Sequence, residues 1–274
     1  MAWSSESVER FWDYVSRRDD LTSTYFSYQV GSGVTNFLSQ SVCLKGRLVL
    51  DYGCGRGYLI RHLLGAEALV SAADSSPDSV QVTELTYAAH ENWRGARVVE
   101  GAEIPWPKDT FDVVTCLETL EHVLPHQLES LLEQIIRVMR PGGVALFSTP
   151  NSENLLESTV CCPNCLTEFH RWQHIRSWSA EQLAGCLRAA GYEVLFCQAL
   201  DFANFQQRRT HWKDCSPRTL LATWRGYVNR VLDTLHPKEF PKGGRLRQLI
   251  RQSRKVHLVA VAKKPREGCL LESE

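Results

Sequence analysis

Short apolar runs alternate with amphipathic stretches along the chain from about residue 46 onward. Glycine and acidic residues bound the apolar runs, which is typical of buried strands. The stretches between them repeat apolar residues about every three or four positions, which predicts helices. Because strands alternate with helices, the pattern predicts an α/β fold with a doubly wound, mostly parallel seven-stranded sheet. The expected strands are RLVLD, ALVSAAD, ARVVEG, FDVVTCLE, VALFSTPN, YEVLFCQALD and VHLVAVAKK.

Several segments flank or interrupt this alternation. Mixed helical periodicity at residues 5–17 and 25–40 predicts a helical lead-in. An insertion at residues 152–176 separates the fifth strand from the helix that follows it. The expected organisation is a lead-in over 1–45, a core over 46–205 plus 256–264, a basic helical insertion over 206–255 and a flexible tail over 265–274.

Charge is balanced over the whole chain, with 31 basic and 31 acidic residues, but it is not evenly spread. Residues 206–255 carry thirteen lysines and arginines against three acidic residues, a local excess of ten positive charges. The stretch PRTLLATWRGYVNRVLDTL places apolar residues on one helical stripe, which fits a helical lid with a solvated face. The same features would suit peripheral contact with anionic lipid headgroups or with phosphates. RNA is the less expected partner, since no recognised RNA-binding motif is present.

The composition is that of an ordinary globular protein, with 43% hydrophobic and 23% charged residues. The N-terminus has acidic side chains and lacks the apolar region of a signal peptide, and no stretch approaches the roughly 18 apolar residues of a membrane span. Ten cysteines without a secretory signal favour reduced thiols or metal ligation over disulfides. We therefore expect a cytoplasmic protein, with peripheral membrane association through the basic insertion as an alternative.

The segment DYGCGRG joins the first predicted strand to its helix. Its glycines, Gly53, Gly55 and Gly57, allow a tight turn and leave room for a ligand against the main chain. Asp51 precedes the turn, and Asp74 ends the second strand, where a carboxylate can accept hydrogen bonds from both hydroxyls of a ribose. Glycine turns also occur without a ligand, so it is the two carboxylates that indicate a nucleotide-like cofactor.

The segments VLDYGCGRG, FDVVTCLETLEHV and MRPGGVALFSTPN resemble those of class I S-adenosylmethionine-dependent methyltransferases. The resemblance covers about residues 49–200 and implies a Rossmann-like methyltransferase fold with S-adenosyl-L-methionine as the methyl donor. By this resemblance, Asp51 would orient the methionine moiety, Asp74 the ribose and Glu100 the adenine region. Leu117, at the end of the fourth strand, would border the same cofactor.

One departure from the family pattern concerns the third strand. Many members carry an aspartate in a GDA stretch where this chain has EGAE. Either Glu100 or Glu103 could therefore take the place beside the adenine.

The segment CLETLEHV places Glu118, Glu121 and His122 where the fourth strand passes to its helix, beside the expected donor. Acidic residues are also common at helix starts, where they interact with the N-terminal dipole, and a histidine there can cap or pack. In a helix, however, this spacing would put the three side chains on one face, as metal ligands require. Two crowded carboxylates also repel each other unless a cation or a proton lies between them.

This arrangement is similar to that of small-RNA 2′-O-methyltransferases, in which E-x-x-E-H and a later histidine bind a divalent metal. The segment HIRSWSAEQL supplies the later histidine, His174. Ubiquinone-pathway O-methyltransferases also resemble the chain at CLETLEHV and at this histidine. The resemblance implies a metal held by Glu118, Glu121, His122 and His174. Mixed oxygen and imidazole ligands suit Mn²⁺, Fe²⁺, Co²⁺ or Zn²⁺ at least as well as Mg²⁺.

The insertion contains CCPNC followed by FHRWQH, and its cysteines indicate a second metal site. The spacing of Cys162 and Cys165 suits zinc, and His170 and His174 could complete a tetrahedron. That site would remove His174 from the first cluster, so the two arrangements exclude each other. Alternatively, Cys161 or a distant cysteine joins Cys162 and Cys165 in a separate zinc site, or the loop holds no ion. We expect His174 in the catalytic cluster, which frees His170 for a role as general base or substrate contact.

Together these patterns predict a metal-assisted, S-adenosylmethionine-dependent O-methyltransferase that acts on a hydroxyl with an adjacent oxygen. The expected catalytic residues are Glu118, His122 and His170. The acceptor is expected to be a small molecule, such as a sugar unit, a catechol-like ring or an acceptor carried on a lipid or phosphate. RNA 2′-O-methylation is the alternative reaction. Outside enzymes, the alternative is a methyltransferase fold that only binds a ligand.

Overall fold

A computed structural model of the chain describes residues 3–101, 103–206 and 257–266. The basic insertion predicted over 206–255, apart from its first residue, lies outside these described residues. The tail predicted over 265–274, apart from its first two residues, also lies outside them. In the part of the chain that the structure describes, no helix is long and apolar enough to cross a bilayer.

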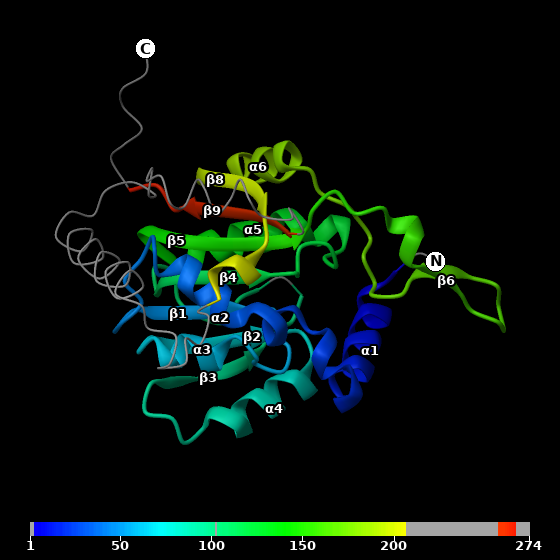
Figure 1. Cartoon of the computed structure of the whole chain (residues 1–274), viewed down its shortest axis with the longest axis horizontal. Helices are drawn as coiled ribbons and strands as arrows, with labels where there is room; N and C mark the ends of the chain where they lie inside the picture. Colours follow the sequence, from blue (N-terminus) through cyan, green and yellow to red (C-terminus); the bar gives the residue numbers. More distant parts are fainter. Residues whose placement is uncertain (1–2, 102, 207–256, 267–274) are drawn as a thin grey trace, which may run out of the picture.

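A seven-stranded sheet in the order β3-β2-β1-β4-β5-β9-β8 forms the centre of the described fold (Figure 1). The neighbours from β3 to β5 pair in parallel, and β9 runs antiparallel to both of its neighbours. The mostly parallel sheet predicted from the sequence is therefore confirmed. In sheet order, the strands are β3 (Trp93–Val98), β2 (Leu69–Asp74), β1 (Leu48–Tyr52), β4 (Phe111–Leu117), β5 (Met139–Pro150), β9 (His257–Lys263) and β8 (Glu193–Leu200).

Helices pack on both faces of this sheet, because successive residues of a strand point to opposite sides. In β1, Val49 packs into an apolar cluster with α2 and α3, whereas Leu50 packs into a second cluster with α5 and α6. The helices are α1 (Ser5–Ser16), α2 (Phe26–Leu38), α3 (Ile60–Gly65), α4 (Pro77–Tyr87), α5 (Pro125–Val138) and α6 (Ala180–Ala189), with 3₁₀ turns η1 (Asp19–Thr24), η2 (Leu155–Ser158) and η3 (Phe202–Phe205).

The central elements follow from simple residue patterns. β4 is an almost continuous buried apolar run, as expected for a strand covered on both faces. α5 buries Leu131, Ile135 and Val138, which recur at helical spacing and face the sheet. Its first position is Pro125, whose fixed φ suits the start of a helix and whose missing N–H would have no partner there. α5 therefore begins at Pro125 and not in the acidic segment before it.

Both helices predicted for the N-terminal lead-in are present. The side chain of Ser4 accepts a hydrogen bond from the amide of Ser7, and the Ser7 side chain bonds back, which caps the start of α1. In α2, a Cβ added at Gly33 would lie 2.1 Å from the carbonyl oxygen of Phe202. A glycine at this position therefore allows α2 to pack closely against η3.

The insertion predicted at 152–176 leaves the main sheet and forms a separate hairpin of β6 (Thr159–Cys161) and β7 (Glu168–His170). Thr159 pairs with His170 near the base of the hairpin, and Cys161 pairs with Glu168 toward its tip. The hairpin projects away from the main sheet beside the N-terminal end of the described chain (Figure 1).

The sheet core supplies a test of this packing. Phe147 lies fully buried in β5, so Phe147→Ala removes a ring whose space the neighbouring strands cannot refill. We expect the free energy of unfolding to fall by about 3–5 kcal/mol. The matched control is Leu85→Ala at an exposed position of α4, for which we expect a change within about 0.5 kcal/mol. Urea unfolding followed by circular dichroism measures both, and equal midpoints for the two variants would contradict the assigned core.

Candidate active site

The carboxyl ends of the parallel strands converge on one edge of the sheet, which is where open α/β sheets bind ligands. Asp51 lies in β1, Asp74 ends β2 and Leu117 ends β4. β1 pairs with both β2 and β4, so these three residues lie on adjacent strands at the same edge. The structure therefore brings together three of the residues predicted for the donor.

The glycine turn after β1 has the geometry that its sequence predicts. Gly53, Gly55 and Gly57 have φ values of 71°, 50° and 76°, in the left-handed region that favours glycine. A Cβ at Gly53 would lie 2.4 Å from the hydroxyl of Thr119, in the segment after β4. The turn is therefore pressed against the end of β4, and a side chain at Gly53 would force the two apart.

Asp74 holds the glycine turn in place. Its Oδ2 accepts a hydrogen bond from the amide of Gly55 at 2.8 Å, and its Oδ1 accepts one from the amide of Ser76 at 2.9 Å. An ionised carboxylate offers about four lone-pair positions, so capacity for two ribose hydroxyls remains. Burial raises the pKa of Asp74, and the bonds from Ser76 and Gly55 lower it. The same side chain can thus fix the turn and bind a ribose.

Asp51 is buried between β1 and β4 and has one side-chain partner. The hydroxyl of Thr115 donates to Asp51 Oδ1 at 2.8 Å. Burial raises the pKa of Asp51 to about 7, against the opposing effect of the Thr115 hydrogen bond. A cationic group placed beside it would restore the ionised form. The amino group of a bound methionine moiety is such a cation.

Glu100 lies just beyond the third strand and not within it, because β3 ends at Val98. The amide of Val99 donates to the carbonyl of Asp74, which places the following turn next to the end of β2. Glu100 and Glu103 pair across a β-bridge in this turn, and both are exposed. Both carboxylates that the sequence offers for the adenine region therefore belong to the same turn.

The N-terminal lead-in covers this edge of the sheet, which the sequence did not predict. Asp13 in α1 accepts a hydrogen bond from the Ser76 hydroxyl at 2.6 Å, next to Asp74. Tyr25, before α2, stacks edge-on against Tyr58, and its ring lies 3.4 Å from the position of a Cβ at Gly55. The aromatic residues near the start of the chain could have indicated that this segment packs on the site. The residues that they contact lie far away in the sequence, so the sequence does not show where they pack.

A second cluster lies at the same edge of the sheet. Ligand atoms of Glu121, His122 and His174 all lie within 4.8 Å of one another. Glu121 is only 1% exposed, and neither of its carboxylate oxygens has a hydrogen-bond partner among the residues that the structure describes. Burial, followed by the charge of Glu118, raises the pKa of Glu121 well above its usual range. Thr149 lies near enough to oppose this shift, although its hydroxyl is not in hydrogen-bonding geometry.

His122 is held as a neutral imidazole. Its ring lies 4.7 Å from the ring of Trp12 in α1 and 4.8 Å from that of His174. Burial, followed by the charge of His174, lowers the pKa of His122 to about 3. Trp12 also donates to the side chain of Gln173 at 3.0 Å, so α1 packs directly on the cluster. A neutral imidazole is the form that coordinates a metal.

Glu153, which the sequence analysis did not single out, joins two histidines of the insertion. Its carboxylate lies 2.5 Å from His174 Nδ1 and 3.5 Å from His170 Nε2. The rings of His170 and His174 stack with centroids 4.4 Å apart. Glu153, His170 and His174 therefore form a second group of closely spaced ligand atoms that shares His174 with the first. In the sequence, a role for Glu153 at the site is indicated only by its position shortly after a strand that ends there.

Glu118 does not belong to either group of ligand atoms. Its backbone is left-handed, with φ of 47°, and its carboxylate accepts a hydrogen bond from the Ser148 hydroxyl at 2.8 Å. His257 in β9 lies 3.6 Å from the same carboxylate oxygen. The single helical face expected for this segment is wrong, because the segment is a turn that ends where α5 begins at Pro125. Three of the four predicted metal ligands thus gather, and the fourth is turned toward β5 and β9.

Two of the three insertion cysteines, Cys162 and Cys165, lie apart from the histidines. His170 pairs with Thr159 near the base of the hairpin, whereas Cys162 and Cys165 lie at its tip. Both groups of closely spaced ligand atoms in the described residues consist of glutamates and histidines alone. The structure therefore does not assemble the combined cysteine–histidine zinc site, and only the separate cysteine site remains as a prediction.

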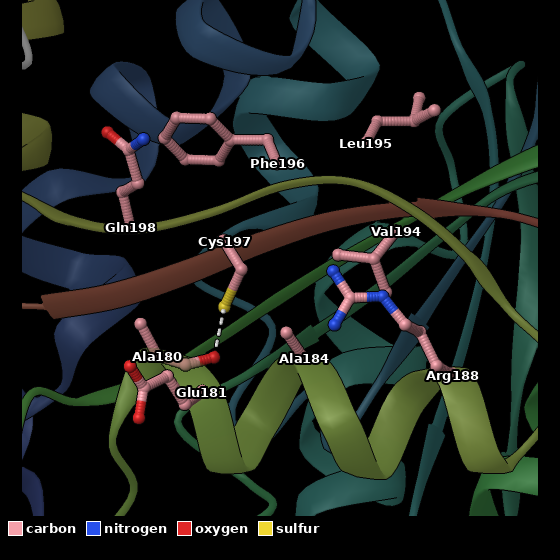
Figure 2. Close-up of a pocket in the computed structure, with 9 residues that line it drawn as sticks. All are labelled: Ala180, Glu181, Ala184, Arg188, Val194, Leu195, Phe196, Cys197 and Gln198. Carbon is pink, nitrogen blue, oxygen red and sulfur yellow. Dashed lines mark hydrogen bonds between the residues drawn. The ribbon is translucent and has the colours of Figure 1, made fainter.

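A shallow groove of about 340 Å³ lies between α6 and the edge strand β8 (Figure 2). Ala184 and Arg188 line it from the helix, and Val194 and Gln198 from the strand. The thiol of Cys197 donates to the carbonyl of Ala180 across its floor (Figure 2). None of the predicted site residues lines this groove, so the candidate chemistry lies at the strand ends.

Comparisons with known proteins agree with this geometry. A family model described as a methyltransferase domain matches residues 25–195. The ubiquinone biosynthesis O-methyltransferase of Ralstonia nicotianae is 29% identical over 231 residues, covering 81% of this chain and 92% of that protein. The enzyme of the same name from Pseudomonas entomophila is 32% identical over 205 residues, covering 68% of this chain and 79% of that protein.

Solved structures share the fold. A chain from a complex of the Haloferax volcanii Trm112 methyltransferase activator with a methyltransferase superposes with a TM-score of 0.61 at 18% identity, covering 93% of this chain and 98% of that one. A Burkholderia thailandensis N1-methyltransferase solved with S-adenosylhomocysteine has a TM-score of 0.58 at 18% identity, covering 97% of this chain and 92% of that one.

The glycine turn between carboxylate-bearing strands, within this strand order, defines a class I S-adenosylmethionine-dependent methyltransferase. The chain belongs to this methyltransferase family, and its relatives place it among the O-methyltransferases.

Asp51 supplies a test of donor binding. Below pH 7 its raised pKa keeps the carboxyl protonated, and above pH 7 the carboxylate can pair with the amino group of S-adenosylhomocysteine. Affinity should therefore fall as the pH drops through 7, by up to about tenfold per pH unit. Asp51→Asn should weaken binding by roughly 10- to 100-fold at higher pH and remove most of this dependence.

Isothermal titration calorimetry across a pH series measures these effects. Asp112→Asn is the matched control, because Asp112 lies at the opposite end of β4 and pairs with Arg140 at the surface. An affinity of Asp51→Asn equal to that of the control at every pH would contradict the role assigned to Asp51.

Proposed function

We propose that the enzyme transfers the methyl group of S-adenosylmethionine to a hydroxyl of a small molecule that carries an adjacent oxygen, with the help of a divalent cation. The observation that carries the proposal is Glu121, a buried carboxylate without a hydrogen-bond partner beside two imidazoles. Burying an unpaired carboxylate is costly, so such a group takes up a proton or a cation. The neutral His122 next to it favours the cation.

Glu121, His122 and His174 are the residues that would hold the cation. One carboxylate and two imidazoles form a donor set that suits Mn²⁺, Fe²⁺, Co²⁺ or Zn²⁺ as well as Mg²⁺. When bound, such a cation supplies positive charge that orients two adjacent acceptor oxygens and makes a hydroxyl more acidic. Glu153 contacts His174 and so would fix the tautomer and orientation of that ligand.

His170 is proposed as a contact for the acceptor and not as the base. Its Nδ1 accepts hydrogen bonds from the backbone amides of Trp172 and His174, at 3.3 and 3.1 Å, so the proton of the neutral ring lies on Nε2, 3.5 Å from Glu153. Burial, followed by the charge of His174, lowers the pKa of His170 and so favours this neutral ring. His122 has a pKa of about 3 and would be a poor base, so we assign it to cation binding. Glu118, held by Ser148 and His257, is placed outside the cation site.

A phenolic acceptor with neighbouring oxygens is the favoured substrate class. The relatives named above are ubiquinone biosynthesis O-methyltransferases, and their name supports an aromatic acceptor for this chain also. The predicted contact of residues 206–255 with anionic membranes or phosphates lies outside the described residues and stays a prediction. The cytoplasmic location also stays a prediction.

Two alternatives remain distinct from this proposal. RNA 2′-O-methylation would use the same E-x-x-E-H segment, but no described feature favours it. A methyltransferase fold that only binds a ligand is the second alternative. Failure to bind S-adenosylhomocysteine would favour that second alternative.

Glu121 is the direct test of the cation site. Glu121→Gln keeps the shape of the side chain and removes its charge. Residues that only support a metal ligand contribute about 10- to 100-fold to metal affinity or activity. Loss of a direct ligand should therefore lower both Mn²⁺ affinity and methyl transfer by more than about 100-fold. Glu129→Gln, at an exposed position of α5, is the matched control and should leave both unchanged. Titration of Mn²⁺ followed by electron paramagnetic resonance measures the affinity. Unchanged Mn²⁺ binding in Glu121→Gln would contradict the assigned ligand.

The acceptor prediction is tested with matched pairs of phenols. A catechol should be methylated more than about tenfold faster than the corresponding phenol with one hydroxyl, because only the catechol offers two adjacent oxygens to a cation. Chelation of the cation should abolish this preference. Methylated product is measured by mass spectrometry. Equal rates for both phenols, unaffected by chelation, would favour metal-free transfer.

A further inference from the structure

The tip of the β6–β7 hairpin forms a compact turn around two thiols. The amide of Cys162 donates to the carbonyl of Thr167 at 2.9 Å, and the amide of Leu166 donates to the carbonyl of Cys162 at 2.8 Å. Leu166 adopts a left-handed φ of 56°, which lets the chain reverse directly after Cys165. These bonds close the segment from Cys162 to Thr167 into a loop that carries both sulfur atoms.

The polar groups of this loop face the sulfur of Cys165. Its Sγ lies 3.2 Å from the hydroxyl of Thr167. That hydroxyl, the backbone amides of Thr167 and Cys165, and the thiol of Cys162 all lower the pKa of Cys165. A thiolate is the form of cysteine that binds a metal. The loop therefore holds the Cys165 sulfur against the Thr167 hydroxyl and near Cys162.

Aromatic contacts hold the base of the hairpin against the body of the protein. Phe169 in β7 packs edge-on against Trp3, with ring centroids 6.1 Å apart, and Trp3 packs in turn on Phe11 in α1. The amide of Arg171 donates to the carbonyl of Ser158 and closes the open end of the hairpin. The tip, which projects from the sheet, is thus presented by an anchored base (Figure 1).

The insertion exposes three large apolar side chains, and one of them, Leu166, lies at the hairpin tip. Leu156 is 80% exposed, Val160 39% and Leu166 75%, and all three lie in this one insertion. The described chain exposes few other large hydrophobic side chains, and those lie in α1, α2 and α4. Apolar residues gathered at a projecting surface are typical of a protein contact site.

We propose that Cys162 and Cys165 bind Zn²⁺ together with the same two cysteines of a second copy of this chain, so that the two hairpins form the contact of a symmetric dimer. Structural zinc sites are closed tetrahedra of about four ligands, and this loop supplies a pair. A two-fold axis through the ion supplies the other pair automatically, because each copy presents the same surface to its partner. Leu166, next to Cys165 at the tip, would be buried by that contact.

This site goes beyond methyl transfer and stands independently of it. Zn²⁺ is not reduced or oxidised, and each copy releases the protons of its two thiols to solvent as the four sulfur–zinc bonds form. The ions at the two sites differ in ligand chemistry, since the methyl-transfer cluster offers only carboxylate and imidazole donors. Thiolate coordination can therefore be measured separately.

The test uses the full-length protein, purified with a phosphine reductant and loaded with Zn²⁺ or Co²⁺. We expect a dimer by light scattering, a thiolate-to-cobalt charge-transfer absorption, and zinc bound through thiolates at one ion for two chains. Cys165→Ser should remove the absorption and yield monomers, whereas the matched control Cys43→Ser, at an exposed position outside the hairpin, should change neither. Leu166→Asp keeps both thiols and adds charge at the contact, so it should also yield monomers.

Three outcomes would overturn the proposal. Absence of thiolate absorption in the Co²⁺ protein would show that the loop binds no such ion. A monomer with one thiolate-bound zinc for each chain that is lost in Cys215→Ser or Cys269→Ser would show that this chain completes its own site. A dimer that persists unchanged in both Cys165→Ser and Leu166→Asp would place the contact elsewhere. Donor binding, measured in parallel, reports on the methyltransferase site and is expected to be unaffected by these variants.

Discussion

Parallel pairing of β1 with β2 on one side and β4 on the other is the constraint on which the described site depends. Because the carboxyl ends of parallel strands meet at one edge, Asp51, Asp74 and Leu117 lie close together although the sequence separates them widely. Helices on both faces keep these strands buried, and Asp74 then fixes the glycine turn through the amide of Gly55. The cofactor site is thus a consequence of strand order, and the turn alone would not create it.

Burial sets the chemistry of the neighbouring cluster. Glu121 has lost its water without gaining a hydrogen bond, which raises its pKa, while the same burial keeps His122 neutral. Such a site accepts one positive charge, as a proton or as a cation. Part of this burial comes from Trp12 in the N-terminal helix, whose ring packs on His122. A segment that lies outside the sheet therefore helps to determine the electrostatics of a site at the strand ends.

The sequence was sufficient wherever the signal was local. The apolar runs predicted the strands because a strand covered on both faces must be apolar along its length, as β4 is. The glycine turn could be predicted because its positive φ values and the close contact of Gly53 with Thr119 require glycine. Asp51 and Asp74 followed from their places at or next to the ends of strands. The E-x-x-E-H segment was recognised as a cluster of ligands, but its conformation was misread as helical.

What remained was decided by tertiary structure. Glu118 has a left-handed backbone, and its carboxylate contacts Ser148 and His257 instead of joining the cluster of Glu121, His122 and His174. The contacts of Glu118 with His257 and of Glu153 with His170 join residues whose proximity depends on strand register and on the path of an insertion. Neither contact produces a pattern in the sequence. A single long-range contact can be made by many residue types, so it cannot be predicted from the residues alone. The sequence by itself thus determined the fold and the place of Asp51 and Asp74 at the strand ends, because both signals are local, whereas only packing decided which acidic groups and histidines meet.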